Sequence, residues 1–181
     1  MKLIHKYLST KIKQSKIEAS NNTLLKIIEG EIKRLGNDAD LNHIDVSKVT
    51  DGSCLFWSLN DCRDFCGDVS KWNVSKIERF DSMFQDCRNF NCDISDWDVS
   101  SGKTMAWMFS NCKKFDQDLS KWDVSGVINF ISMFEFCDSF NHDLSNWDLS
   151  EKKKSNTTQM FYSCPIKIEF KPKLPSNFPK K

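Results

Sequence analysis

A motif of eight residues returns every 25 residues along most of this chain. It reads Asp-Val-Ser-Lys-Trp-Asn-Val-Ser at 68–75 and recurs with small changes at 93–100, 118–125 and 143–150. A fixed period of about 20 to 50 residues is typical of solenoids, in which each coil packs only on its neighbours. The period therefore predicts a protein that offers an extended surface rather than a deep pocket.

The spacing of apolar residues within one period suggests the local structure. Val69, Trp72 and Val74 follow the L-x-x-L-x-L spacing of leucine-rich repeats, which predicts a short strand. Downstream, apolar residues recur at helical spacing, as in Ile77, Phe80, Met83, Phe84 and Cys87. We therefore expect an α/β fold: a leucine-rich-repeat-like solenoid of five 25-residue strand-turn-helix coils with an N-terminal capping helix.

The ends of the array divide the chain into three parts. Residues 1–40 are expected to form an N-terminal helical cap, in which Asn21 or Asn22 begins a helix over 21–35 and Gly36 ends it. Residues 41–164 would hold the five coils, of which the first and the last are irregular. Residues 165–181 would add a cap strand at 166–170 and a basic, proline-rich tail.

The string Met-Phe-x-x-Cys-x-x-Phe-Asn-x-Asp-Ile-Ser-x-Trp-Asp-Val-Ser at 83–100 carries a family resemblance. It closely resembles the 25-residue repeat of BspA-like bacterial surface proteins, a leucine-rich-repeat-like family, and the resemblance covers residues 41–164. Many such relatives look like surface proteins that bind other proteins. Small unsecreted arrays of this type also look similar to proteins of bacterial viruses, so the resemblance implies either setting.

Composition and motifs bear on the class of function. The formal net charge of +1 gives nucleic acid no attractive field. No glycine-rich phosphate loop is present, and no Ser, His and Asp set recurs, so we expect a non-enzymatic protein without a cofactor or a metal. The first residues lack the uninterrupted apolar core of a signal peptide, and no stretch is long enough to span a membrane. We expect a cytoplasmic protein, or a virion component if phage-encoded, without a membrane partner.

Variation between repeats indicates a binding face. Residues on the solvent side of the expected strand change from coil to coil while the core positions stay apolar, which is how repeat proteins build recognition surfaces. This candidate binding face comprises Lys71, Asn73, Asp96, Asp98, Lys121, Asp123, Asn146 and Asp148. The expected partner is another protein, with self-association as an alternative. The expected role is protein–protein interaction and, if the chain is phage-encoded, that of a structural or host-interaction component.

Two features leave an alternative open, namely a cation- or glycan-binding adhesin-type protein. Stacked coils would align Asp68, Asp93, Asp118 and Asp143 in one column and the Asx residues of the candidate face in another, where a calcium ion could bridge neighbours. The favoured interpretation is that these carboxylates accept backbone amides at turns. The repeated tryptophans could form a stacking face, but their register favours core packing, which leaves Trp57 and Trp107 as exposed anchors.

Eight cysteines occur, and five of them share one repeat position: Cys62, Cys87, Cys112, Cys137 and Cys164. We expect them to form a buried column of reduced thiols, because a buried thiol behaves as a small hydrophobe. Cys66 and Cys92 stand outside that column at neighbouring coil positions. They could form a redox pair or half of a metal site, although two free thiols are the favoured interpretation.

Overall fold

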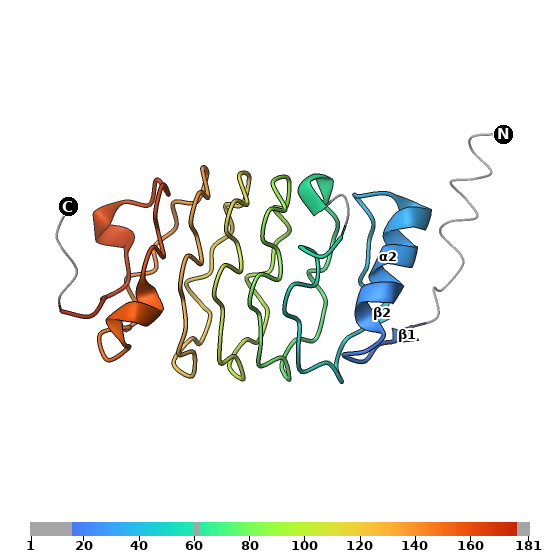
Figure 1. Ribbon diagram of the computed structural model, residues 1–181, viewed down its shortest axis with the longest axis horizontal. Helices are drawn as coiled ribbons and strands as arrows, with labels where there is room; N and C mark the ends of the chain where they lie inside the picture. Colours follow the sequence, from blue (N-terminus) through green and yellow to red (C-terminus); the bar gives the residue numbers. More distant parts are fainter. Residues whose placement is uncertain (1–15, 60–61, 177–181) are drawn as a thin grey trace.

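The computed structural model describes residues 16–59 and 62–176. They form a row of loops stacked side by side, with one α-helix at the N-terminal end of the row (Figure 1). The elements are β1 (Ile17–Glu18), α2 (Leu24–Leu35), β2 (Ile44–Asp45), η1 (Cys62–Asp64), η2 (Lys154–Thr157) and η3 (Ile168–Phe170), where η denotes a 3₁₀ helix. β1 and β2 pair in parallel, with Ile17 opposite Ile44. No described helix has the length and apolar character needed to cross a membrane.

The expected N-terminal helix is confirmed as α2, although it begins later than the sequence suggested. Thr23 occupies the N-cap position, and its hydroxyl accepts a 2.9 Å bond from the Ser20 amide rather than capping the helix. Leu24 and Ile28 point into the core, and Gly36 ends the helix at φ 96°, a left-handed conformation that glycine adopts without a Cβ clash. Asn21 instead accepts a 2.9 Å bond from the Thr50 amide, which ties the start of α2 to the first loop.

The prediction of five strand-turn-helix coils is wrong. Residues 16–59 and 62–176 contain one α-helix, one pair of two-residue strands and a few isolated bridges, and the segments expected to be helical consist of turns. Ser82 (φ 53°) and Asp86 (φ 62°) adopt left-handed backbone, and Ser132 (φ 52°) and Phe136 (φ 56°) repeat this at the equivalent positions. A residue with positive φ cannot continue a right-handed helix.

A second reason is that the amides a helix needs are bonded to the next loop instead. The amides of Phe80, Ser82, Phe84 and Asp86 donate, at 2.8 to 3.0 Å, to the carbonyls of Thr104, Ala106, Met108 and Ser110, in that order. Residues 105–111 repeat the pattern onto 129–135, and residues 130–136 repeat it onto 156–162. We call this array of hydrogen bonds between neighbouring loops the ladder. The apolar spacing at 77–87 thus marks the buried side of the ladder rather than a helix.

The segments expected to be strands are also turns. The Trp72 amide donates to the Val69 carbonyl at 3.1 Å, and the Ile77 amide donates to the Val74 carbonyl at 2.8 Å. Both are the tight i to i+3 closures of β-turns. The L-x-x-L-x-L spacing places the correct residues inside, but the backbone between them folds sharply instead of extending.

The core consists of aromatic columns that run along the stack. Phe84, Phe109, Phe134 and Phe161 stack at ring-centroid distances of 5.9, 5.7 and 5.5 Å. A parallel column contains Phe65, Phe90, Phe115 and Phe140 at about 6 Å spacing. The repeated tryptophans Trp72, Trp97, Trp122 and Trp147 are at most 4% exposed, so the prediction that they face the core is confirmed.

The C-terminal part also differs from expectation. Residues 168–170 form η3 instead of the cap strand. This segment still stacks on the preceding loop, because the Leu144 amide donates to the Phe170 carbonyl at 2.8 Å and the Leu149 amide donates to Lys173 at 2.9 Å. The tail is described only as far as residue 176, so most of the expected basic, proline-rich end lies outside the described residues.

Candidate functional site

The predicted binding face is exposed on the turns opposite the ladder. All eight of its side chains are exposed: Lys71, Asn73, Asp96, Asp98, Lys121, Asp123, Asn146 and Asp148. Its charges are loosely paired, with Lys121 Nζ 4.0 Å from Asp96 and Lys173 Nζ 3.5 Å from Asp148. Exposed pairs of this kind contribute little to stability, so these charges are available to a partner. That they bind one stays a prediction.

The acidic columns have a structural role, as the favoured interpretation held. In the first column, Oδ1 of Asp68, Asp93, Asp118 and Asp143 each accepts the amide of the serine two residues later, at 2.8 to 3.0 Å. In the second column, Asp98, Asp123 and Asp148 do the same at 3.0 to 3.1 Å, and Asn73 does so at 3.2 Å. These are Asx-turns.

The same bonds hold the aspartates in their charged form. Hydrogen bonds from Ser100 lower the pKa of Asp98, and those from Ser125 lower the pKa of Asp123. At Asp68, burial favours the neutral acid, but hydrogen bonds from Ser70 and Cys92 outweigh it and lower the pKa to about 2. Over the described ranges, no three His, Cys, Asp or Glu side chains converge as a metal site would require.

The cysteine column is confirmed at its three inner members. Cys87, Cys112 and Cys137 are fully buried, and all eight cysteines are free. Cys112 Sγ donates to the Phe84 carbonyl and Cys137 Sγ to the Phe109 carbonyl, each at 2.9 Å. Burial raises the pKa of all three thiols well above the usual value, so they are protonated and unreactive.

The outer members of the column differ. Hydrogen bonding with Cys87 lowers the pKa of Cys62 to about 7, although Cys62 is only 9% exposed. Cys164 is partly buried, and burial raises its pKa to about 11. The thiol whose pKa is lowered is therefore largely covered.

Cys66 and Cys92 line the same shallow pocket, together with Asp68, Asn89 and Asn91. Cys92 Sγ accepts the Val69 amide at 3.4 Å and lies 3.5 Å from Asp68 Oδ1. Burial raises the pKa of Cys92 to about 12, which removes it as a nucleophile or a thiolate ligand. The favoured interpretation of two free thiols is confirmed.

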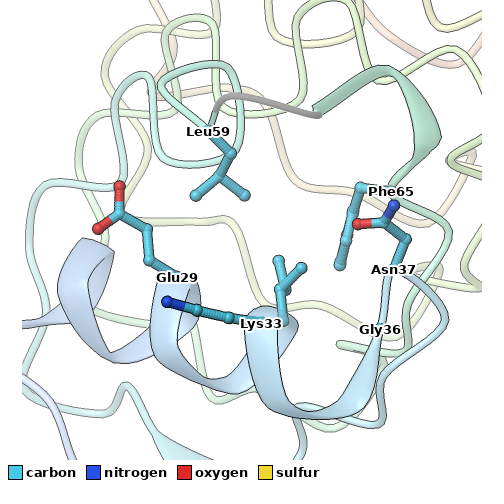
Figure 2. Close-up of a pocket in the computed structure, with 7 residues that line it drawn as sticks. Glu29, Lys33, Gly36, Asn37, Leu59 and Phe65 are labelled. Atoms are coloured by element: carbon cyan, nitrogen blue, oxygen red, sulfur yellow. The ribbon is translucent and has the colours of Figure 1, made fainter.

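A larger pocket lies between α2 and the first loop (Figure 2). Glu29 and Lys33 from α2 stand at its edge, while Leu59 and Phe65 face them from the other side. Glu29 and Lys33 are the ionisable residues among the seven described residues that line it. Neither is paired with a nucleophile in this lining, so the pocket offers no set of groups for acid–base or covalent chemistry.

The unexpected feature is a set of exposed aromatic side chains on the ladder. Trp57 is 46% exposed, Trp107 39%, Phe136 40% and Tyr162 53%. We call these four residues the aromatic strip. The exposure of Trp57 and Trp107 confirms the sequence prediction, whereas Phe136 and Tyr162 were missed.

A signal for the two missed residues does exist in the repeat alignment. Phe136 takes the position that Asp86 and Asn111 occupy in the preceding coils, and Tyr162 takes the position of Glu135. An aromatic residue in a slot that other coils fill with polar groups is thus exposed. The same comparison places Trp107 in the slot of Ser82 and Ser132.

The C-terminal half of the strip is ordered by direct contacts. The Phe136 and Tyr162 rings meet edge to face at 5.4 Å. Lys113 Nζ lies 5.4 Å from the centre of the Phe136 ring and 3.1 Å from Asp138 Oδ1. The Phe136 amide also donates to the Tyr162 carbonyl at 2.9 Å, so both side chains project from bonded backbone.

Comparison with known proteins gives one family. A family model described as a Mycoplasma protein of unknown function, DUF285, matches residues 57–171. A search of curated proteins found no match, and a search of solved structures found none.

Proposed function

The chain belongs to the DUF285 family, and we propose that it is a non-enzymatic protein-interaction module whose partner binds the aromatic strip. Within this proposal, kinship to BspA-like repeats is supported by the motif at 83–100. A cytoplasmic or virion location stays a prediction from the sequence.

The observation that carries the proposal is the exposure of four large aromatic rings on the ladder side of the stack. Aromatic residues are enriched in the centres of protein interfaces, where they bury a large area at a small cost in side-chain entropy. Trp107, Phe136 and Tyr162 are each 39% to 53% exposed although the core has aromatic columns directly beneath. The folded chain therefore leaves much of these apolar rings uncovered, and a partner can bury them.

The backbone under the strip is suited to recognition because it is fixed. Trp107 and Phe136 donate their own amides to the next loop at 2.8 and 2.9 Å. Side chains that project from hydrogen-bonded backbone lose little freedom when they bind. Lys113 and Asp138 beside Phe136 add a polar rim.

A cation-binding role receives less support. The oxygens that would bind calcium accept serine amides, and a bound ion would have to compete with those bonds. The exposed aromatic strip has no such internal use.

The experiment uses substitutions taken from the equivalent positions of other coils, because residues that the repeat already accepts should disturb the fold little. The strip variant combines Trp107→Ser, Phe136→Asn and Tyr162→Glu, each the residue type that another coil carries at that position. Wild-type protein, the strip variant and a control variant of the predicted face (Lys71→Glu with Lys121→Glu) are used as bait in lysate of the source organism, and captured proteins are quantified by mass spectrometry.

The proposal expects a partner that the control variant retains and the strip variant loses. A partner lost only with Lys71→Glu and Lys121→Glu would move the site to the predicted binding face. Capture of the same proteins by all three baits would contradict specific recognition by either surface.

A further inference from the structure

The two ends of the ladder differ in how they are covered. At the N-terminal end α2 lies beside the first loop (Figure 1), buries Leu24 and Ile28 and is fixed to Thr50 through Asn21. At the C-terminal end the last row of the ladder is 157–163. Its carbonyls at 158, 160 and 162 accept the amides of Ser132, Phe134 and Phe136.

The opposite side of that last row carries unused donors. The amides of Gln159, Phe161 and Ser163 bond to no group among residues 16–59 and 62–176. They occupy the same alternate positions from which Ser132, Phe134 and Phe136 donate to the next row. Every inner row uses these amides to hold a neighbour, so the last row is an open edge in the same register.

An aromatic column ends at the same edge. Phe161 is the last ring of the column in which Phe134 is 5.5 Å away, and it is only partly buried. On its free side, Lys171 Nζ lies 5.8 Å from the ring centre. An apolar or aromatic side chain placed against Phe161 would continue the column.

The segments that flank the edge are basic. Six lysines lie at 152–154, 167, 171 and 173, whereas the acidic residues between 151 and 173 are Glu151 and Glu169. Lys152 Nζ donates to the Ser125 carbonyl and Lys173 Nζ pairs with Asp148, which leaves the other four lysines for a partner. Lys153, Lys154 and Lys167 are exposed. A surface of this sign attracts acidic partners and speeds their association.

We propose that the C-terminal edge of the ladder binds an acidic segment of another polypeptide, which takes up the turn conformation of the inner rows and adds one row to the stack. Its carbonyls accept the amides of Gln159, Phe161 and Ser163, an apolar side chain packs on Phe161, and acidic side chains face the lysines. As in strand addition to a sheet edge, backbone bonds give affinity and side chains give specificity. The inference rests on the proposed function only in taking the ligand to be a polypeptide, and its surface is the end of the stack, to which the strip contributes Tyr162 alone.

The probe is a fluorescent synthetic peptide, Glu-Val-Glu-Phe-Glu-Val-Glu, with a control peptide in which every Glu is Lys. Fluorescence anisotropy measures binding, and amide hydrogen exchange followed by NMR measures protection. We expect the acidic peptide alone to bind and to slow exchange at Gln159, Phe161 and Ser163. Lys154→Glu with Lys171→Glu should weaken binding at least about tenfold, while the matched pair Lys76→Glu with Lys103→Glu, on exposed lysines of inner loops, should not.

Several results would overturn the inference. Binding without protection of these three amides, or equal weakening by both lysine pairs, would place the peptide elsewhere. Protection of these three amides in the peptide-free protein would show that the edge is already covered. If that protection does not depend on protein concentration, the rest of the chain covers the edge. If the protection increases with concentration, a second copy covers it. The variant Trp107→Ser with Phe136→Asn, which leaves the last row unchanged, should still bind the peptide, so failure of the strip and failure of the edge are distinguishable.

Discussion

The indole of Trp122 donates a hydrogen bond of 3.1 Å to the backbone carbonyl of Ile94, which lies 28 residues earlier. Trp97 does the same to Val69 at 3.2 Å, and Trp72 to Leu41 at 2.9 Å. On the turn side of the stack, these buried indoles replace the backbone ladder that joins the loops on the other side. The indole nitrogen of Trp147 is the exception, because it is buried without a partner among the described residues.

This exception allows the indole bond to be measured. Replacing either Trp97 or Trp147 by Phe removes similar volume, but only Trp97→Phe removes a hydrogen bond, after which the Val69 carbonyl keeps the Trp72 amide as its donor. We expect Trp97→Phe to lower the free energy of unfolding by roughly 1 kcal/mol more than Trp147→Phe does. Urea titrations of both variants check this, and equal losses would show that the indole bonds add nothing.

A second prediction concerns the volume of the repeated tryptophans. Trp122→Ala should cost about 3 to 5 kcal/mol, because the side chain is 4% exposed in a central loop and its removal leaves a cavity. Trp107→Ser, at a 39% exposed position, should change the unfolding free energy by less than about 1 kcal/mol. A loss below about 1 kcal/mol for Trp122→Ala in a denaturant titration would contradict its role in the core.

The contrast between these two tryptophans shows what the sequence could predict. The 25-residue period and the apolar spacing correctly gave the inward tryptophans, the cysteine column, α2 and the turn role of the aspartates. Each of these depends on side-chain pattern or local turn chemistry, which a sequence carries directly.

The backbone conformation could not be derived in the same way. Apolar residues at 77, 80, 83, 84 and 87 fit a helix, and nothing in that spacing shows that Ser82 and Asp86 adopt positive φ. The choice depends on whether the Phe84 amide bonds within its own segment or to Met108 in the next loop. Packing between residues far apart in the sequence decides which of these two bonds forms. The same packing leaves the Phe136 and Tyr162 side chains exposed.

A third prediction concerns thiol reactivity. In native protein, iodoacetamide should label Cys66 first, because its side chain is exposed, whereas Cys112 and Cys137 should react only after unfolding. Burial raises the pKa of both inner thiols, so raising the pH moderately should not make them reactive. Mass spectrometry of labelled peptides gives the order, and fast native labelling of Cys112 would contradict the packed column.

A fourth prediction concerns acid. The pKa of Asp68 is lowered to about 2 in the folded protein, below its value of about 4 in an unfolded chain. A lowered pKa means that the contribution of Asp68 to stability is complete above about pH 4 and is lost as the pH falls toward 2. Hydrogen bonds from serines lower the pKa of Asp93, Asp98 and Asp123 as well, so their contributions are also complete above about pH 4 and decrease at lower pH.

Urea titrations between about pH 6 and about pH 2.5 should therefore show a steady loss of unfolding free energy below about pH 4. Asp68→Asn keeps an oxygen that can accept the Ser70 amide but cannot titrate, so its loss over this range should be smaller than that of wild-type protein. Identical pH dependence in the two proteins would show that Asp68 does not carry this charge effect.

The fifth prediction tests the left-handed backbone that replaces the expected helix. Phe136 has φ 56°, a conformation that Asn tolerates and that β-branched side chains resist. Phe136→Asn and Phe136→Val both lose the ring contact with Tyr162, yet Asn should be the more stable by roughly 1 kcal/mol, the reverse of the order that hydrophobicity predicts. At Ile128, which is 60% exposed and has no positive φ, Val should be at least as stable as Asn. Thermal or urea unfolding of the four variants decides the matter, and greater stability of Val at both sites would mean that position 136 is not left-handed.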